Sequence, residues 1–438
     1  MARLVCKFGG TSVADAAQVR RVEAILALDP RRRVVVVSAP GKRHATDRKI
    51  TDLLFTCHQL AQADLDYAQP LGLIADRFTQ LAAELHTPGA ADQPLADLRA
   101  GLAAGQSADW VASRGEHISA RVIAAAFGAT FVETAAHLGI DEAGLPTPDS
   151  YPRLAAALDG DGLFIVPGYY GHGPDGAVKV FSRGGSDITG AAVARAVGAA
   201  VYENWTDVSG FMMADPRIVP EARPIGEITY RELRELAYMG ASVLHDESVF
   251  PVRQVDIPIH IKNTNAPQDP GTRIVAERDF GDRAVVGIAG RRDFTVLHIA
   301  KDLMNKELGF GRRVLAILER HGINFEHMPS GIDSMSVVMA EEDAAGKLDA
   351  VLDEVRRTLQ PDNVWVAHDL ALVTTVGEGM AFRVGIAARC FSALAAAGVN
   401  VRMITQGVAE VNIVVGVARD DFETAVRALY QAFVAQQL

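Results

Sequence analysis

The chain repeats one pattern that strongly limits its fold: a run of β-branched and other apolar residues ends in a turn of glycine and small polar residues. The pattern occurs at residues 3–13, 33–42, 162–176 and 178–187. Strands that are apolar along their whole length are typical of parallel sheets with helices on both faces. Because stretches of helical composition separate these runs, the sequence predicts an α/β layered fold with a mostly parallel sheet.

The first of these runs also carries polar chemistry at its end. Lys7 lies just before Gly9 and Gly10, and Thr11 and Ser12 follow them. Glycines let the backbone approach a ligand closely, and the exposed amides of such a turn attract anions. The usual phosphate loop has its lysine after the second glycine, so this order differs from it. Taken alone, the stretch leaves two interpretations open: a phosphate-binding turn and an ordinary strand-to-helix turn.

Length and composition indicate a globular chain of more than one domain. Its 438 residues are too many for one compact core, and 49% of them are hydrophobic. The net charge of −11, without a basic stripe, argues against nucleic acid as the main partner. No run of about twenty apolar residues is present, so we expect no membrane segment. Cys6, Cys57 and Cys390 lack metal-ligand spacing and fit buried thiols in a reducing cytoplasm, and we expect no metal site.

A longer repeat marks the carboxyl-terminal part. Residues 309–338 are similar to residues 385–414, at a constant offset of 76 residues. Each copy predicts strand, helix, two strands, helix and strand, which is the βαββαβ pattern of a duplicated α+β domain. We therefore expect three domains, at residues 1–290, 291–368 and 369–438.

Four turns, at Gly9, Gly41, Gly184 and Asp207, are expected to follow strands of one sheet. Loops at the carboxyl ends of parallel strands meet at one edge and form the binding crevice. Two cations and several acids at that edge suit phosphoryl transfer, in which negative charge is neutralised and the acceptor is held in line. The side chains expected to meet there are Lys7, Glu116, Arg183, Asp187 and Asp207.

Six ordered motifs resemble those of the aspartate kinases. They are residues 7–12 (KFGGTS), 113–116 (SRGE), 183–187 (RGGSD), 205–208 (WTDV), 214–217 (ADPR) and 239–245 (MGASVLH). The resemblance covers the whole chain, because the carboxyl-terminal repeat is similar to tandem ACT regulatory domains. Six motifs in order are far more specific than a single glycine loop.

This resemblance implies a fold and a reaction. The fold would be the amino acid kinase fold, an αβα sandwich with a mostly parallel eight-stranded sheet, followed by two ACT-type domains. The reaction would transfer the γ-phosphoryl group of ATP to the side-chain carboxylate of L-aspartate, giving 4-phospho-L-aspartate for lysine, threonine and methionine biosynthesis. ATP with Mg²⁺ would be the substrate complex, without a tightly bound cofactor. Lysine or threonine, or both, would act as effectors on a homodimer or a dimer of dimers.

The resemblance also assigns roles to residues. Lys7 would neutralise charge on the transferring phosphoryl group, and Asp187 would orient that lysine. Glu116 would accept the α-amino group of the substrate, and Arg183 would clamp its α-carboxylate. The remaining implied contacts are Ser38, Thr51, Gly184 and Ser186 for the substrate; Lys7, Gly9, Gly10, Thr206, Asp207, Met212, Asp215 and Arg217 for ATP; and Met304, Gly309, Phe310, Asn324, Phe325 and Glu326 for an effector.

Some questions stay open from the sequence. Ser182 and Met212 depart from the common family pattern, which leaves the adenine and ribose contacts undefined. His245 is interpreted as structural, because a carboxylate acceptor has no proton to lose to a base. One alternative is a kinase of the same fold that acts on glutamate, acetylglutamate or a nucleotide monophosphate. Another is an amino-acid sensor without catalysis, against which the intact Lys7 and Asp187 argue.

Overall fold

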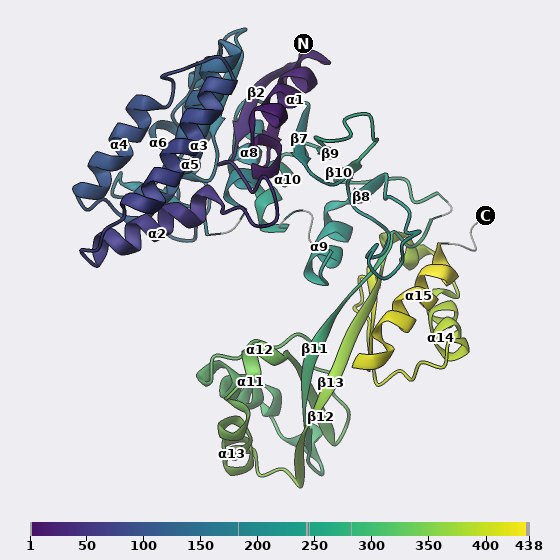
Figure 1. Ribbon diagram of the computed structural model, residues 1–438. Coiled ribbons are helices and arrows are strands. Elements are labelled where there is room, and N and C mark those ends of the chain that lie inside the picture. Colours follow the sequence, from purple (N-terminus) through teal and green to yellow (C-terminus); the bar gives the residue numbers. More distant parts are fainter. Residues whose placement is uncertain (1, 183, 242–243, 245, 282, 435–438) are drawn as a thin grey trace. The chain divides into compact units, whose positions relative to one another are not determined.

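The computed structural model describes residues 2–434, except residues 183, 242, 243, 245 and 282 (Figure 1). The chain forms two compact units, each made of three segments that are not contiguous in the sequence. Unit 1 comprises Met1–Phe211, Pro224–Tyr230 and Val243–Arg278, and unit 2 comprises Met212–Arg223, Arg231–Ser242 and Asp279–Leu438.

Unit 1 is built on an eight-stranded sheet. Its strands are β1 (Leu4–Phe8), β2 (Arg32–Val37), β3 (Thr130–Phe131), β4 (Phe164–Pro167), β7 (Val201–Thr206), β8 (Glu227–Thr229), β9 (Ile259–Asn263) and β10 (Thr272–Val275). They lie in the order β3-β4-β2-β1-β7-β9-β10-β8, and every neighbouring pair is parallel except β9 and β10. The predicted, mostly parallel sheet is confirmed.

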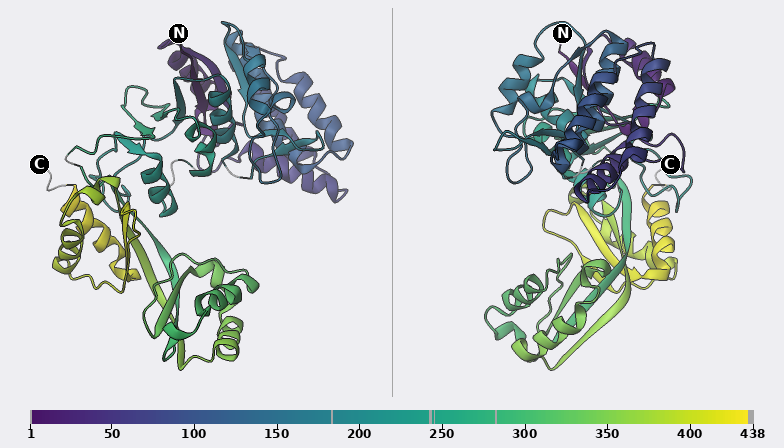
Figure 2. Two further views of the ribbon diagram at one scale, coloured as in Figure 1. Left: turned by 180° about the vertical axis from the view of Figure 1, so that it is seen from behind. Right: turned by 60° about the vertical axis from the view of Figure 1, so that its left-hand side comes forward.

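Helices cover both faces of this sheet (Figures 1 and 2). On one face, helices α1 to α5 share a hydrophobic core with side chains of β1 and β2 that include Phe8, Val35 and Val37. Helix α8 packs against β1, β2 and β7, with α7 and α10 beside it. The helices of unit 1 are α1 (Ala16–Ala27), α2 (Ile50–Gln62), α3 (Ala68–Glu84), α4 (Asp92–Ala103), α5 (Ala108–Phe127), α6 (Thr134–His137), α7 (Ser150–Ala157), α8 (Gly185–Ala196) and α10 (Phe250–Arg253).

One predicted strand does not belong to the main sheet. Residues 178–180 form β6 (Val178–Val180), which pairs antiparallel with β5 (Tyr170–His172) in a separate hairpin. The expectation that Gly184 follows a strand of the main sheet is therefore wrong. The connection from β5 to β6 is short and rich in glycine, so β6 pairs antiparallel with β5. A parallel pair would need a crossover of a dozen or more residues.

Unit 2 contains a five-stranded sheet in which every neighbouring pair is antiparallel. The strand order is β12-β11-β13-β15-β14. The strands are β11 (Gly287–Ala300), β12 (Ser334–Ala340), β13 (Asn363–Val376), β14 (Met403–Thr405) and β15 (Asn412–Ala418). The helices are α11 (Phe310–Arg320), α12 (Glu341–Ala344), α13 (Leu348–Leu359), α14 (Ile386–Ala396) and α15 (Phe422–Phe433), together with α9 (Tyr230–Tyr238), which begins in unit 1.

The two sequence repeats share the long strands β11 and β13. Helices α11 and α13 lie beside one half of this strand pair, and α14 and α15 lie beside the other half (Figure 1). Residues 287–291 pair with the end of β13, so the second repeat is completed by a segment that precedes the first repeat in the chain. The predicted domain limits at residues 290 and 368 fall inside β11 and β13 and stay predictions.

The first repeat lacks the regular strand predicted near Met328. Only single bridges, from His327 to Val338 and from Ser330 to Met335, are formed there. Pro329 lies between them and has no amide to donate to a ladder, which accounts for the interruption. The second repeat has no proline at this point and forms β14.

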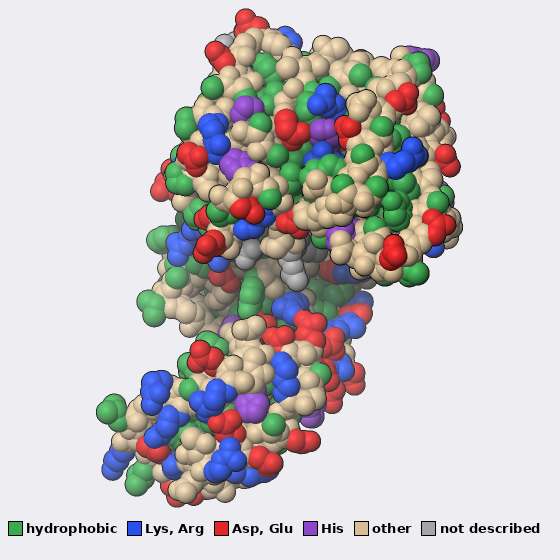
Figure 3. Space-filling view, turned by 90° about the vertical axis from the view of Figure 1, so that its left-hand side faces the viewer, with side chains coloured by type: hydrophobic (Ala, Val, Ile, Leu, Met, Phe, Trp, Pro, Cys, Tyr) green, Lys and Arg blue, Asp and Glu red, His purple; other side chains and the backbone are tan. Residues whose placement is uncertain are grey.

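The described surface and interior carry further general features. The face seen in Figure 3 mixes acidic and basic side chains. Within the described ranges, no helix is both long and apolar enough to cross a membrane. The same residues include no group of three or more His, Cys, Asp or Glu side chains that could hold a metal ion.

The close contact between the turns after β1 and β2 leads to a stability prediction. A Cβ atom at Gly41 would lie 2.7 Å from the carbonyl carbon of Gly10 and 2.9 Å from the amide nitrogen of Thr11. We expect Gly41→Ala to push the two turns apart and lower the free energy of unfolding by about 1–3 kcal/mol. Urea denaturation measures the effect.

Gly72 in α3 supplies the control, because a Cβ atom there would meet nothing within 4 Å. We expect Gly72→Ala to raise stability by up to about 1 kcal/mol, since alanine favours the helix over glycine. Equal unfolding free energies for Gly41→Ala and the wild type would contradict the packing argument.

Candidate active site

Lys7 and Asp187 form a buried ion pair at the edge of the main sheet. The Nζ atom of Lys7 lies 2.5 Å from Oδ1 of Asp187, and the two side chains are 10% and 15% exposed. Lys7 is the penultimate residue of β1, and Asp187 lies in the first turn of α8. The positive end of a helix dipole stabilises a carboxylate at that position. The structure thus brings together the two residues that the sequence predicted to face each other.

Strand β7 holds the carboxylate of this pair in place. The side-chain amide of Asn204 donates a hydrogen bond to Oδ1 of Asp187 at 2.8 Å, and Tyr202 donates to the backbone oxygen of Asp187 at 3.1 Å. Asn204 lies opposite Lys7 in the β1–β7 register. The sequence analysis missed Asn204. A polar amide in the middle of a buried strand was the available signal, since a buried polar group needs a partner.

Backbone hydrogen bonds link the turns around the pair. The amide of Gly9 donates to the carbonyl of Trp205 at 3.0 Å, and the amide of Gly41 donates to the carbonyl of Gly10 at 2.8 Å. Gly184, at φ 57°, is the N-cap residue that precedes α8. The carboxyl ends of β1, β2 and β7 therefore form one edge, and the positive end of the α8 dipole favours anions there.

Glu116 is a second buried carboxylate, on α5. Its residue is 5% exposed, and its Oε2 atom has no hydrogen-bond partner among the described residues. Burial raises the pKa of Glu116 to about 8, although a hydrogen bond from the backbone amide of Ala39 opposes that shift. Gly115 permits this approach, because a Cβ atom there would lie 2.9 Å from that of Ala39. Such a carboxylate is suited to a ligand that brings a positive charge.

The other predicted substrate contacts lie at the ends of β2, α2 and α8 or outside the described residues. Ser38 directly follows β2, and Thr51 lies in the first turn of α2. Ser186 lies in the first turn of α8 and packs closely on Gly168. A Cβ atom added at Gly168 would lie 2.6 Å from the hydroxyl oxygen of Ser186. Arg183 and His245 lie outside the described residues, so their predicted roles rest on sequence alone.

The predicted nucleotide contacts divide between the two units. Thr206 ends β7, and its hydroxyl donates to the carboxylate of Asp207 at 3.3 Å. Met212, Asp215 and Arg217 belong to unit 2. There Arg217 pairs with Asp215 at 2.6 Å, and the hydrogen bonds from Arg217 lower the pKa of Asp215. Their role in nucleotide binding stays a prediction.

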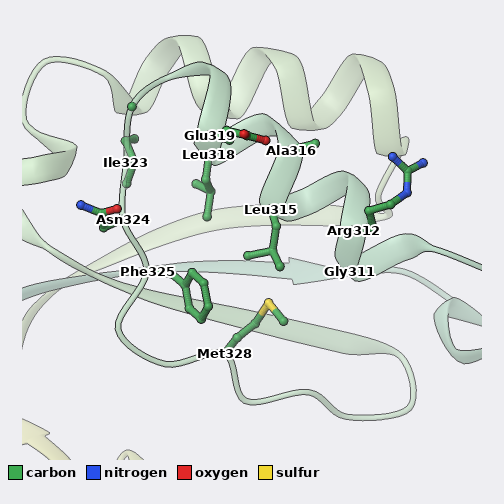
Figure 4. Close-up of a pocket in the computed structure, with 11 residues that line it drawn as sticks. Gly311, Arg312, Leu315, Ala316, Leu318, Glu319, Ile323, Asn324, Phe325 and Met328 are labelled. Atoms are coloured by element: carbon green, nitrogen blue, oxygen red, sulfur yellow. The ribbon is translucent and has the colours of Figure 1, made fainter. Parts of the chain in front are cut away.

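Unit 2 has a cavity of about 840 Å³ beside α11 (Figure 4). Leu315, Phe325 and Met328 point into it. Of the six predicted effector contacts, Asn324 and Phe325 line this cavity. Of the other four, Met304 and Phe310 belong to the hydrophobic core, and Gly309, at φ 77°, is the N-cap residue that precedes α11. The carboxylate of Glu326 accepts a hydrogen bond from the hydroxyl of Tyr238, and its Oε1 atom lies 3.6 Å from Nη1 of Arg291.

Comparison with known proteins decides the family. Residues 2–263 match the model of the amino acid kinase family, and residues 373–433 match that of the ACT domain. The chain is 42% identical to Aspartokinase 3 of Bacillus subtilis over 98% of each chain. The chain belongs to the aspartate kinase family. The enzyme class predicted from its six motifs is therefore confirmed.

Solved aspartate kinases have the same fold. The crystal structure of the Clostridium acetobutylicum aspartate kinase superposes with a TM-score of 0.95 at 44% identity, covering 98% of this chain and all 100% of that one. The structure of Escherichia coli aspartokinase III in complex with lysine and aspartate gives a TM-score of 0.78 at 27% identity and covers 99% of each chain. The predicted amino acid kinase fold with a carboxyl-terminal ACT region is confirmed.

The raised pKa of Glu116 predicts how stability depends on pH in this aspartate kinase. Because the folded state holds the proton up to about pH 8 and the ordinary carboxyl releases it near 4.5, the contribution of Glu116 is greatest below pH 4.5 and is lost as pH rises to 8. We expect the wild type to lose a few kcal/mol relative to Glu116→Gln between about pH 5 and pH 8, at ~1.4 kcal/mol per pKa unit.

Urea denaturation of the ligand-free protein at a series of pH values tests this expectation. Glu23, which is exposed on α1, provides the control Glu23→Gln, whose stability curve should run parallel to that of the wild type. A Glu116→Gln curve that also ran parallel to the wild type would contradict the assignment.

Proposed function

We propose that the enzyme transfers the γ-phosphoryl group of MgATP to the side-chain carboxylate of L-aspartate, giving ADP and 4-phospho-L-aspartate. The observation that carries this proposal is the buried Lys7–Asp187 pair at the same sheet edge as an unpartnered buried carboxylate, Glu116, in a member of the aspartate kinase family. A cation and a carboxylate at one edge match the opposite charges of a phosphoryl group and an amino acid.

Lys7 supplies charge stabilisation in this reaction. Its ammonium group is fixed by Asp187, which is itself fixed by Asn204, so little reorganisation is needed when negative charge develops on the transferring oxygens. The acceptor is already ionised, so the step needs no general base. The remaining work is to hold the acceptor oxygen in line with the phosphorus.

Glu116 provides recognition of the amino acid. An ammonium group beside its carboxylate restores the missing counter-charge and lowers its pKa again. The motif assigns the α-carboxylate to Arg183, with Ser38, Thr51, Gly184 and Ser186 as further contacts. The reaction would then act on an amino acid with a short acidic side chain.

The nucleotide is assigned to the turns after β1 and β7. Gly9, Gly10, Thr206 and Asp207 would contact it, together with Met212, Asp215 and Arg217, and Mg²⁺ would arrive as part of the substrate. The structure of E. coli aspartokinase III, at a TM-score of 0.75 and 27% identity, was solved with aspartate and ADP, which supports a nucleotide as a ligand of this fold.

The ACT region is assigned to feedback control by lysine or threonine, or by both. The residues proposed for the effector are Met304, Gly309, Phe310, Asn324, Phe325 and Glu326, and a similar enzyme has been solved with lysine. We also infer a homodimer or a dimer of dimers, because an open five-stranded sheet has edges that a second copy can pair with. A reducing cytoplasm suits its three buried, free cysteines.

The reaction can be tested by trapping the acyl phosphate with hydroxylamine. We expect an aspartyl hydroxamate with L-aspartate and little product with L-glutamate. Lys7→Met and Asp187→Asn should each lower kcat by roughly a thousandfold, the loss expected for a preorganised charge. Arg357→Met on α13 serves as a control with wild-type activity. Product with glutamate alone would refute the assignment of the substrate.

The effector site can be tested with two equivalent asparagines of the repeats. If lysine or threonine binds at the first repeat, Asn324→Ala should raise the inhibitory concentration roughly tenfold, the cost of a hydrogen bond to a charged group. Asn400→Ala, its equivalent in the second repeat, should leave inhibition unchanged. If neither amino acid alters the activity or the melting temperature of the wild type, regulation by those ligands is excluded.

A further inference from the structure

A connection at the reacting edge is held by an arginine that no motif contains. Residues 38–49, here called the acceptor loop, join β2 to α2 and contain no helix or strand. The loop begins at Ser38 and is followed at once by the turn of α2 that carries Thr51, two residues proposed to contact the substrate. A loop without regular structure keeps a fixed shape only where tertiary contacts impose it.

Arg77 of α3 supplies those contacts. The residue is 7% exposed. Its Nη1 atom lies 3.1 Å from Oδ2 of Asp47 and donates to the carbonyl of Arg48 at 3.0 Å. Its Nη2 atom donates to the carbonyls of Gly41 and Ala14. One guanidinium group thus binds three points of the acceptor loop and one point after β1.

Asp47 extends this anchor within the acceptor loop. Its Oδ2 atom also accepts hydrogen bonds from the backbone amide of Arg43 at 3.0 Å and from the side-chain Nε of Arg43 at 2.9 Å. Hydrogen bonds from Arg43 and the nearby charge of Arg77 hold the pKa of Asp47 well below its usual range. Arg77 and Asp47 therefore fasten both the middle and the end of the loop to α3.

The turn after β1 does not depend on Arg77 to the same extent. The amide of Gly9 donates a hydrogen bond to the carbonyl of Trp205, and the hydroxyl oxygen of Ser12 lies 2.8 Å from the hydroxyl oxygen of Thr264. Loss of the guanidinium group would therefore release the acceptor loop more than the turn proposed to bind ATP.

We propose that Arg77 is a positioning residue that holds the acceptor loop in the shape that binds the amino-acid substrate. This inference rests on the proposed function for the identity of that substrate. The planar, forked guanidinium suits four oxygen acceptors in different directions, whereas the single ammonium group of lysine cannot reach all of them.

The test compares Arg77→Met, Arg77→Lys and a control that removes another arginine of the same unit, one whose side chain is 10% exposed. Arg32 lies at the opposite end of β2 and pairs with Glu203 at 2.8 Å, so Arg32→Met is the matched control. Hydroxamate kinetics give kcat and the KM of each substrate, and melting temperatures report stability. Hydrogen exchange of peptides from residues 41–48 reports the loop in the substrate-free protein.

For Arg77→Met, we expect the KM for aspartate to rise roughly tenfold or more and the KM for ATP to change less than about threefold, the effect of losing several charge-assisted hydrogen bonds on one side of the site. Residues 41–48 should exchange faster. Arg77→Lys should bring the KM for aspartate part of the way back to the wild-type value. Arg32→Met should lower the melting temperature and leave the KM for aspartate unchanged. If Arg77→Met does not fold, Asp47→Asn should give the same split to a smaller extent.

Two results would overturn the inference: an unchanged KM for aspartate in Arg77→Met, or equal increases in both KM values that Arg32→Met reproduces. Failure of the proposed function is a separate result, because it would appear as a wild type that forms no aspartyl hydroxamate.

Discussion

The buried pair of Lys7 and Asp187 is the interaction on which the rest of the site depends. A charge pair removed from water is stable only when its geometry is good and its remaining hydrogen-bonding groups are satisfied. Strand β1 supplies the lysine, the first turn of α8 supplies the acid, and Asn204 of β7 donates to that acid. The parallel sheet and the helix that follows the β5–β6 hairpin therefore fix one ammonium group at the carboxyl-terminal edge of the sheet.

One buried and one partly buried glutamate in this unit have opposite pKa shifts. Burial raises the pKa of Glu133, but hydrogen bonds from His117 and Tyr170 outweigh it and lower that pKa to about 2. For Glu116, by contrast, only backbone hydrogen bonds oppose the effect of burial, and its pKa rises to about 8. Glu133 is satisfied within the protein, whereas Glu116 has a free oxygen among the described residues. The unfavourable burial of Glu116 is relieved when a cationic group binds beside it.

Much of this arrangement could be predicted from the sequence, because buried strands and glycine turns leave a local signature. Lys7 and Asp187 were predicted to meet, and they do. The predicted strand at residues 178–180 lies instead in a hairpin, because an apolar run does not show which strand it will pair with. Ala39 contributes a backbone amide, which has no sequence signature, and Arg77 lies in an ordinary helical stretch where only the folded chain reveals its four acceptors.

The pairing of the repeats shows the same limit at a larger scale, and it bears on regulation. An offset of 76 residues reveals the duplication, but it cannot show that residues 287–291 complete the second repeat. Because β11 and β13 run through both repeats, neither repeat has a complete sheet of its own. The β11–β13 register shifts on both sides of Phe294, where the two halves join. A ligand that moves either strand in one repeat therefore changes hydrogen-bonded neighbours in the other, which provides a physical connection for coupling between them.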